Sequence, residues 1–429
     1  MKIYNWNQLS KDEQRQVLAR PLLKDKENIR VKTQEIIDSV KVHGDQTLRE
    51  LTAKYDGAQI AQLQVTAEEF QQAAEQIDPA ARTAIEFAKK QIETNHQAQL
   101  PYIQKIETCT GVLCERQARP IERVGLYIPG GSAPLVSAVL MQAVPAQIAN
   151  CPLRILCTPP DASGTINPYI LLAAELCGIK QVYKVGGAQA IAAMAYGTES
   201  IPKVDKIFGP GNAWVTQAKI LVSQDAKGAS IDMPAGPSEV MVIADAQANP
   251  IFVAADLLSQ AEHGVDSQVM LITLSAAFAQ QVERCLQTQL EKLPRRAIAQ
   301  QALLNSRTII ADDIKQAIMI NNYYAPEHLI LQVENPEQFI SSIQNAGAVF
   351  LGPWSPETVG DYVTGSNHVL PTYGYAKTFS GLSVTDFMKF INFQTVTRAG
   401  LEIIGPFAEK LAEIEGLDAH KNAVSLRLT

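Results

Sequence analysis

One predicted helix end carries two residues that could bind a metal ion. Asn249-Pro250 predicts the start of a helix whose polar end is Ser259-Gln-Ala-Glu-His-Gly264. Gln260 and His263 are three residues apart, so they are expected to project from one helix face. A carbonyl oxygen and an imidazole nitrogen are plausible ligands of a divalent metal. The pair alone is a weak signal, since the solvated end of a surface helix often has the same residues.

An acid–base pair is predicted beside a buried strand. Glu327 and His328 are adjacent in Ala325-Pro-Glu-His-Leu329, at the start of the apolar strand expected over His328–Gln332. Histidine titrates near neutral pH, and burial can raise the pKa of a glutamate toward it, so the pair suits general acid–base catalysis. Without further context, a surface turn introduced by Pro326 is the simpler interpretation.

Further polar candidates lie toward the C-terminus. Asp361, in Gly360-Asp-Tyr362, could supply a carboxylate ligand, and His368 could order its glycine-rich loop or contact a substrate. Glu415 and His420 lie in a polar tail that could simply fray.

The cysteines do not indicate a thiolate metal site. None of the six cysteines forms a Cys-x-x-Cys pair, and in a chain of this length they do not indicate a disulfide scaffold. A metal site would therefore use Gln260, His263, Asp361 and one of the remaining histidines. A mixed site without cysteine is typical of a catalytic metal with open coordination positions.

Three glycine-rich turns could hold a nucleotide. Gly130-Gly131-Ser132 and Gly186-Gly187-Ala188 follow expected strands, where a ligand can approach backbone amides at a helix N-terminus. Phe208-Gly-Pro-Gly-Asn212 is a third such turn, but neither G-x-G-x-x-G nor a P-loop sequence occurs. Any one of the three could be an ordinary strand-to-helix turn. For the three together, a nucleotide cleft and ordinary turns are about equally good explanations.

Alternating strands and helices are expected to position these residues. Apolar runs separated by helical patterns predict an α/β fold with parallel, doubly wound sheets. The first series has strands over 124–128, 153–157 and 181–185, with helices ending at 148 and over 169–176 and 188–195. The second has strands over 239–244, 268–274, 308–311, 328–332 and 348–351, with helices over 251–263, 276–290 and 314–319. Helices are also expected before residue 100, introduced by Thr66-Ala-Glu-Glu69 and Asp78-Pro79, and again over 385–397 and 406–416.

Composition excludes several classes of protein. The 429 residues are 46% hydrophobic and 19% charged, which indicates a globular chain. A net charge of −7 argues against nucleic acid as a partner. The polar start has no apolar signal core, and no apolar stretch reaches the roughly 20 residues that span a bilayer. We therefore expect a cytoplasmic protein with no membrane partner.

Six motifs in order carry a family resemblance. They are Val-Gly-Leu-Tyr-Ile-Pro-Gly-Gly (124–131), Val-Gly-Gly-Ala-Gln-Ala-Ile (185–191), Phe-Gly-Pro-Gly-Asn (208–212), Ser-Gln-Ala-Glu-His-Gly (259–264), Ala-Pro-Glu-His-Leu (325–329) and Gly-Asp-Tyr (360–362). Together with the tail around Glu415 and His420, they resemble the histidinol dehydrogenase family along essentially the full chain. The resemblance implies zinc-dependent oxidation of L-histidinol to L-histidine through L-histidinaldehyde with two NAD, the last two steps of histidine biosynthesis. It also implies one zinc ion per subunit and a homodimer with shared active sites.

The same resemblance implies roles for individual residues. Zinc ligands are expected at Gln260, His263, Asp361 and His420, and acid–base roles at Glu327 and His328. Substrate contacts are expected at Ser238, Gln260, His263, His328, Asp361, Glu415 and His420, and NAD contacts at Tyr127, Gln189 and Asn212. In this family pattern, the partner subunit supplies Glu415 and His420.

The implied fold has two incomplete Rossmann-like lobes with parallel sheets, plus small N- and C-terminal helical extensions. Residues 1–23 would form the N-terminal extension, and 24–128 with 238–381 the main lobe, which includes the helical front section and most site residues. Residues 129–237 would form an inserted NAD-binding lobe, and 382–429 a C-terminal extension reaching the partner.

Three other functions fit parts of the pattern. A relative acting on another amino alcohol or a sulfonated diol should lack the residues that bind the imidazole and amine of histidinol. Ser238, Glu415 and His420 are all present, which favours histidinol. A zinc hydrolase would use the metal and a glutamate base, but it leaves the glycine-rich turns unexplained. A noncatalytic metal-dependent binding protein would not need the pair Glu327 and His328.

Overall fold

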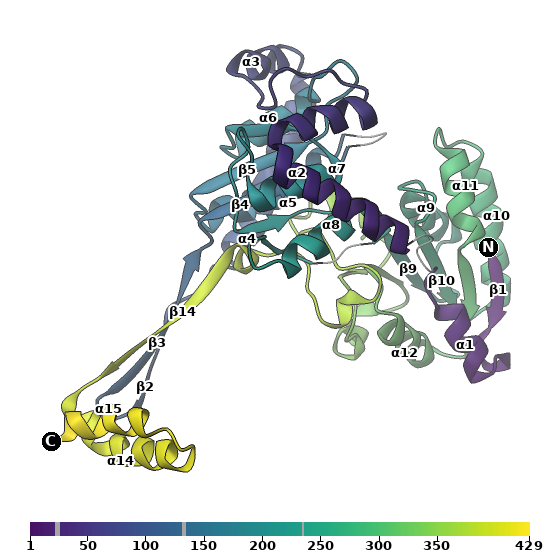
Figure 1. The fold of residues 1–429 in the computed structure, drawn as a ribbon. Helices are drawn as coiled ribbons and strands as arrows, with labels where there is room; N and C mark the ends of the chain where they lie inside the picture. Colours follow the sequence, from purple (N-terminus) through teal and green to yellow (C-terminus); the bar gives the residue numbers. More distant parts are fainter. Residues whose placement is uncertain (22–25, 131–133, 234–235) are drawn as a thin grey trace.

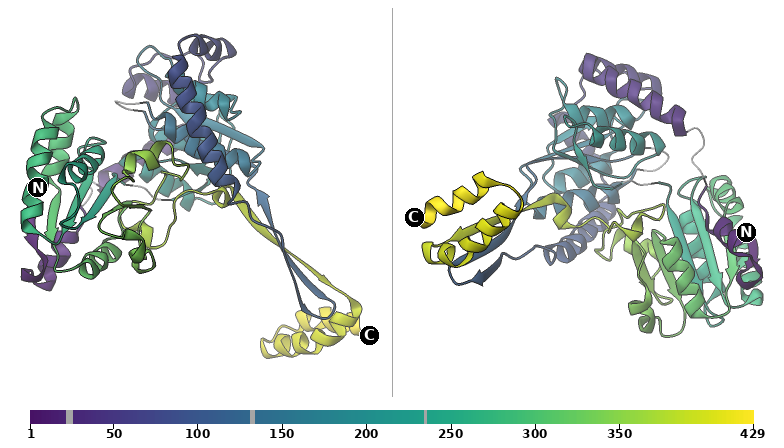
Figure 2. Two further views of the ribbon diagram at one scale, coloured as in Figure 1. Left: turned by 180° about the vertical axis from the view of Figure 1, so that it is seen from behind. Right: turned by 60° about the horizontal axis from the view of Figure 1, so that its bottom comes forward.

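Two bodies built on parallel sheets and one long arm make up the molecule (Figure 1). The computed structural model describes residues 1–21, 26–130, 134–233 and 236–429. Figure 2 shows from two further sides that the arm stands away from both bodies and ends in the two C-terminal helices. The predicted α/β fold with two parallel sheets is confirmed. Among the described helices, none combines the length and apolar character needed to cross a membrane, and the predicted cellular location stays a prediction.

The first body contains a six-stranded sheet in the order β1-β11-β10-β9-β12-β13, with every neighbouring pair parallel. Its strands are β1 (Lys2–Asn5), β9 (Glu239–Ala244), β10 (Gln268–Thr273), β11 (Arg307–Ile310), β12 (His328–Gln332) and β13 (Ala348–Leu351). Its main helices are α9 (Pro250–Ala261), α10 (Ala276–Leu290), α11 (Arg296–Leu304) and α12 (Ile314–Tyr324). Strands β9, β10 and β12 are buried along their whole length, which explains why they are unbroken apolar runs in the sequence.

The N-terminal segment belongs to this sheet, because β1 pairs with β11. It continues through the 3-10 turn η1 (Trp6–Gln8) into α1 (Lys11–Leu18). The predicted N-terminal extension is thus partly a strand of the first body and not only helical.

The second body contains a five-stranded sheet in the order β6-β5-β4-β7-β8, again all parallel. Its strands are β4 (Arg123–Tyr127), β5 (Leu153–Thr158), β6 (Gln181–Lys184), β7 (Lys206–Phe208) and β8 (Ser230–Ile231). Its helices are α5 (Val136–Ile148), α6 (Pro168–Leu176), α7 (Gly187–Tyr196) and α8 (Ala213–Gln224). The predicted strand–helix alternation is confirmed here, with β7, α8 and β8 in addition.

Three helices from the front of the chain cover the second body. They are α2 (Lys26–Tyr55), α3 (Ala67–Glu75) and α4 (Pro79–Gln97). The predicted capping box is present, with Thr66 and Glu69 each satisfying the other's backbone amide. Helix α2 packs on α7 and α8, α3 on α6, and α4 on α5.

These contacts bear on the predicted lobes. The prediction placed residues 24–128 with the body of residues 238–381, but β4 lies in the middle of the five-stranded sheet and α2–α4 pack on its helices. The packing therefore groups these elements with the second body. The domain boundaries themselves are not defined by these contacts and stay a prediction.

The arm is an antiparallel sheet in the order β14-β3-β2, formed by β2 (Gln104–Cys109), β3 (Val112–Pro120) and β14 (Met388–Val396). The predicted helix over 385–397 is wrong. Only the short 3-10 turn η4 (Val384–Phe387) is helical, and β14 then pairs with β3 from Met388↔Pro120 to Val396↔Val112. Aromatic and β-branched residues dominate this segment, and they favour an extended chain.

Two helices complete the arm. The predicted helix over 406–416 begins earlier, as α14 (Arg398–Ile414), because Thr397 Oγ accepts a hydrogen bond from the Gly400 amide at 3.1 Å. The tail does not fray but forms α15 (Asp418–Leu428), which packs along α14. The remaining elements are α13 (Glu357–Tyr362), η2 (Pro336–Ser342) and η3 (Tyr375–Lys377).

Candidate active site

The predicted acid–base pair lies at the amino-terminal edge of the six-stranded sheet. Glu327 immediately precedes β12 and His328 is its first residue, and both are buried. The backbone of Glu239, at the start of β9, holds both side chains. Its N–H donates to Glu327 Oε2 at 2.8 Å, and its carbonyl oxygen is 3.0 Å from His328 Nδ1. This contact assigns the proton to Nδ1 and leaves Nε2 of the neutral ring as the basic nitrogen.

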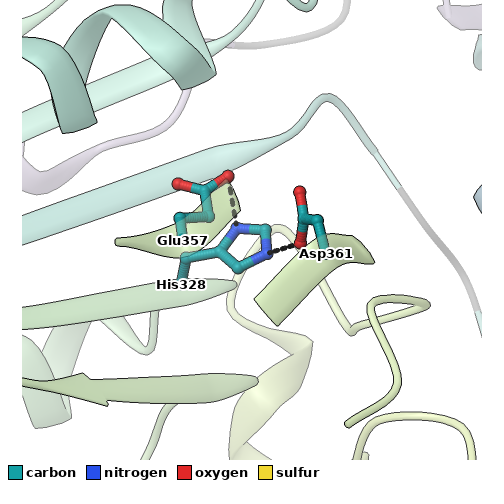
Figure 3. A group of neighbouring side chains, drawn as sticks. All are labelled: His328, Glu357 and Asp361. Atoms are coloured by element: carbon teal, nitrogen blue, oxygen red, sulfur yellow. Dashed lines mark ion pairs between the residues drawn. The ribbon is translucent and has the colours of Figure 1, made fainter. Parts of the chain in front are cut away.

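Helix α13 brings two carboxylates to His328. Glu357 and Asp361 are one helical turn apart, and the imidazole lies between their side chains (Figure 3). Glu357 Oε1 is 3.6 Å from His328 Nδ1, and Asp361 Oδ1 is 3.7 Å from Nε2. One potential ligand atom from each of the three residues lies within 4.8 Å of the others, so this group could hold a metal ion.

Burial and mutual charge shift the proton affinities of this cluster. Burial raises the pKa of Glu327 to about 8, although His328 and the Glu239 amide act in the opposite direction. Burial likewise raises the pKa of Glu357 to about 7 against the effect of His328. Burial alone would lower the pKa of His328, but Glu357, Glu327 and Asp361 together raise it well above its ordinary value. The carboxyls of Glu327 and Glu357 therefore titrate near neutral pH, where proton transfer is most effective.

Gln260 lies in the last turn of α9, which packs against α13, and it is fully buried. Neither of its amide atoms has a hydrogen-bond partner. His263 lies in a turn beyond the helix, since α9 ends at Ala261 and the predicted helix to residue 263 was too long. Although His263 is exposed, partial desolvation of its ring lowers its pKa, with a smaller raising effect of Asp361. The contact between α9 and α13 thus brings the helix of Gln260 against the helix of Glu357 and Asp361, and His263 lies within electrostatic range of Asp361 and His328.

Several buried polar atoms of this cluster and of the elements packed near it have no hydrogen-bond partner. They are both amide atoms of Gln260, His328 Nε2, Glu357 Oε2 and His368 Nε2. Burial lowers the pKa of His368 against the nearby charge of Asp361, which places this histidine in the same cluster. Buried polar atoms in folded proteins are almost always satisfied, so this concentration indicates a site that binds a polar or metal group.

The remaining predicted site residues divide between the cluster and the arm. Ser238 directly precedes Glu239 and β9, so it lies beside the acid–base pair. Glu415 follows α14 and His420 lies in α15; both are exposed on the arm, far from β12 in every view (Figure 2). A single chain therefore does not bring them to His328.

A separate cavity of about 880 Å³ lies at the carboxyl ends of β4, β5, β6 and β7. The three predicted NAD residues, Tyr127, Gln189 and Asn212, all line it. The Gly187 amide donates to the Tyr127 hydroxyl at 3.0 Å, and Asn212 caps α8 by accepting from two of its amides. This is the edge where ligands bind in open α/β sheets. Gly131 and Ser132 of the first predicted turn lie outside the described residues.

The third glycine-rich turn packs against Tyr127, one of the residues that line this cavity. Gly209 has φ +122°, and a Cβ at this position would be 2.1 Å from the Tyr127 carbonyl oxygen. The buried ion pair of Lys219 with Asp232 fixes the turn, since Lys219 Nζ donates to the Gly209 carbonyl at 2.7 Å and Asp232 accepts from the Gly209 amide. Only glycine fits here, which explains the first glycine of the Gly-Pro-Gly sequence.

Comparisons with known proteins identify the family to which this fold belongs. A family model described as histidinol dehydrogenase matches residues 20–428. The chain belongs to the histidinol dehydrogenase family. It is 52% identical to the histidinol dehydrogenase of Vibrio vulnificus over 100% of this chain and 98% of that protein, and 53% identical to that of Escherichia coli over 99% and 97%. A crystal structure of histidinol dehydrogenase from Elizabethkingia anophelis has 51% identity and a TM-score of 0.95, and covers 100% of this chain and 98% of that one.

Within this histidinol dehydrogenase fold, one member of the cluster had not been predicted. Glu357 follows Pro356 in a segment with no helical apolar pattern, so nothing drew attention to it. The available signal was its spacing: two acids four residues apart, Glu357 and Asp361, share one face if the segment is helical.

Proposed function

We propose that this chain oxidises L-histidinol to L-histidine through L-histidinaldehyde, reducing two NAD. Family membership supports this reaction, as do relatives that are named histidinol dehydrogenases. The observation that carries the proposal is the set of unpartnered polar atoms around His328, directly beside the buried acid Glu327. A second, dinucleotide-sized cavity lined by Tyr127, Gln189 and Asn212 fits the cofactor.

One zinc ion per subunit fits the donor set of the cluster. Gln260, His263 and Asp361 offer an amide oxygen, an imidazole and a carboxylate without any thiolate, the kind of set found in catalytic sites. We infer that His420 of the partner subunit is the fourth ligand. Bound zinc would supply a Lewis acid that can hold the imidazole and amine of the substrate.

The first proton transfer is assigned to His328. Its Nδ1 faces the Glu239 carbonyl, so in the neutral form of the ring Nε2 is the nitrogen that can accept the proton of the substrate hydroxyl as the hydride leaves carbon for NAD. The carboxylate of Asp361, and those of Glu357 and Glu327 in their ionised forms, stabilise the imidazolium that results.

The second proton transfer is assigned to Glu327. We infer that its carboxylate takes a proton from the water that adds to the aldehyde, which gives a hydrate able to lose the second hydride. Its pKa of about 8 makes it a strong enough base once ionised. The Glu239 amide fixes the orientation of this carboxylate at 2.8 Å.

Counting NADH formed per histidinol tests these assignments. The native protein should give about two equivalents, and Glu327→Gln about one with aldehyde released, because only hydration is impaired. His328→Asn should give almost none, and the matched surface variant Glu334→Gln should behave as the native protein. Full conversion to histidine by Glu327→Gln would remove Glu327 from the second step, and no NADH from the native protein would refute the redox proposal.

We also propose that two chains form a homodimer with shared active sites. Within one chain, Glu415 and His420 lie far from the cluster that the family pattern assigns them to. Helix α14 on the same arm exposes apolar side chains at helical spacing: Ile403, Phe407, Leu411 and Ile414. Such a stripe on an isolated arm is suited to packing against a second copy.

Mixing two variants that should each fail to form histidine tests the shared site. Glu327→Gln damages the body and His420→Ala damages the arm, so a mixed dimer would regain one intact site of its two. Co-expression in equal amounts should then restore about a quarter of the native rate of histidine formation if the dimer has two-fold symmetry. The control pair, Glu327→Gln with His328→Asn, should restore none. No recovery from the first pair would mean that each site is built from one chain.

A further inference from the structure

The dinucleotide cavity is lined by acids and not by cations. Its described lining residues include the carboxylates of Asp56, Glu69 and Asp161, and no lysine or arginine is among them. A phosphorylated ribose would normally be met by an arginine or lysine. The electrostatics of this wall therefore favour hydroxyl groups over phosphate.

Two of the three acids are already satisfied by neighbouring residues. Glu69 pairs with the ammonium group of Lys184 at 2.8 Å. Asp161 accepts hydrogen bonds from the amides and hydroxyls of Ser163 and Thr165, at distances from 2.6 to 3.1 Å. Against the raising effect of burial, these bonds hold the pKa of Asp161 below its ordinary value. Neither acid needs a ligand to complete its hydrogen bonding.

Asp56 differs from both. It directly follows α2, and its Oδ2 atom is buried without a hydrogen-bond partner. Burial raises its pKa to about 6, so the carboxyl is mostly ionised at neutral pH although no donor faces it. Its charge also contributes to the raised pKa of Tyr127, after the larger effect of burial, which places Asp56 near a predicted cofactor contact. A buried carboxylate oxygen without a donor, in a ligand cavity, is an unfilled acceptor.

We propose that Asp56 accepts a hydrogen bond from a ribose hydroxyl of the bound dinucleotide and excludes a dinucleotide phosphorylated on that ribose. This inference rests on the proposed function, since it takes the cavity to be the NAD site. In Rossmann folds, an acid after the second strand usually binds the ribose. Here that position is Asp161, after β5, and its oxygens are occupied by Ser163 and Thr165. Asp56, directly after the front helix α2, is the free acceptor instead.

The negative charge of Asp56 explains why the cavity would select NAD over a dinucleotide phosphorylated on the ribose. A ribose hydroxyl gives Asp56 the donor it lacks, and hydrogen bonds to charged groups are among the stronger ones. A phosphate in the same place would put two like charges together in a partly desolvated cavity, with no described cation in the lining to separate them. Asparagine at position 56 would remove the repulsion and weaken the hydrogen bond.

Calorimetric titration with NAD and with NADP, without histidinol, tests the inference directly. The native protein should bind NAD and hardly bind NADP. Asp56→Asn should weaken NAD binding about 10-fold and shift the NADP-to-NAD affinity ratio about 100-fold toward NADP. The control Asp161→Asn removes the same charge from the same cavity, and its ratio should stay within about 3-fold of native.

Each outcome has one meaning. If the native protein binds NAD but Asp56→Asn leaves the ratio unchanged, the role of Asp56 is refuted and the proposed function stands. If Asp161→Asn shifts the ratio as much as Asp56→Asn, selectivity comes from the total charge of the wall and not from Asp56. If neither dinucleotide binds the native protein, the proposed function itself fails. A shift in Asp56→Asn steady-state kinetics should appear in KM for NAD and not in kcat, because the contact exists before and during hydride transfer.

Discussion

Replacing one buried acid outside the proton-transfer pair should stabilise the protein. Asp256 lies in α9 and is 5% exposed. Its Oδ2 accepts a hydrogen bond from Gln332 Nε2 at 3.0 Å, while Gln332 Oε1 is buried without a partner. Burial raises the pKa of Asp256 from 3.8 to about 6, with Gln332 opposing. The folded state therefore holds a proton at Asp256 more tightly than the unfolded chain does.

The sign and size of the effect follow from this difference. Because the pKa of Asp256 is higher in the folded state than in the unfolded chain, ionisation of Asp256 opposes folding. The resulting loss of folding free energy is absent below pH 4, grows between pH 4 and 6, and is complete above pH 6. A rise of this size corresponds to about 3 kcal/mol. Asp256→Asn removes the charge and can also donate to Gln332 Oε1. We expect the free energy of unfolding to increase by about 1–3 kcal/mol at pH 8.

Urea unfolding measures this change in the free energy of unfolding, at pH 8 and at pH 5 and at one fixed protein concentration. The gain from Asp256→Asn should be clearly smaller at pH 5, where part of the native Asp256 is protonated. The control Asp38→Asn replaces an exposed acid and should change stability by less than about 0.5 kcal/mol at either pH. An equal gain at both pH values would show that hydrogen bonding and not ionisation is responsible, and no gain at pH 8 would refute the reasoning.

Three further changes should have distinct effects. Arg20→Ala leaves the carboxylate of Glu239 buried without its guanidinium partner, which is 2.8 Å away in the native protein. The free energy of unfolding should fall by about 3–5 kcal/mol and kcat should also fall, and Arg20→Lys should give intermediate values of both. Gly209→Ala should lower stability and weaken NAD binding, because its Cβ would collide with the Tyr127 carbonyl. The control Gly57→Ala has φ +71° and no atom within 4 Å of the new Cβ, so it should lower the free energy of unfolding by only about 1 kcal/mol. Chelation should abolish NADH formation and lower the melting temperature, and added zinc should restore both; full activity after verified metal loss would contradict a zinc enzyme.

The sheets could be predicted from the sequence because their strands are buried on both faces. Strands such as β9 and β12 must then be unbroken apolar runs, and such runs are visible without a structure. The arm strand β14 gives no such signal: it is exposed along nearly its whole length, and only its pairing with β3 makes it a strand. Its partner is more than 260 residues away in the chain, a distance that local patterns do not reach.

The site was only partly predictable for a related reason. Glu327 and His328 are neighbours in sequence, so their pairing needed no tertiary information. Glu357 reaches His328 only because α13 folds back over the start of β12. Glu239 contributes its backbone amide and carbonyl, which every residue type except proline has, so its identity gives no signal in the sequence. Asp56 became visible only once its missing hydrogen-bond partner could be seen.

One candidate site lies at the amino ends of the strands of its sheet and the other at the carboxyl ends of the strands of the second sheet. The acid–base pair is at the amino ends of β9 and β12, while the dinucleotide cavity is at the carboxyl ends of the other sheet. The loop after α13 contacts the second body, since Asn367 Nδ2 donates to the Met141 carbonyl of α5 at 2.6 Å and lies 3.2 Å from His96 Nε2. The next residue, His368, belongs to the cluster around His328. The proposed hydride transfer would require the two sites to be held at a fixed separation, and this loop supplies one of the contacts between the two bodies.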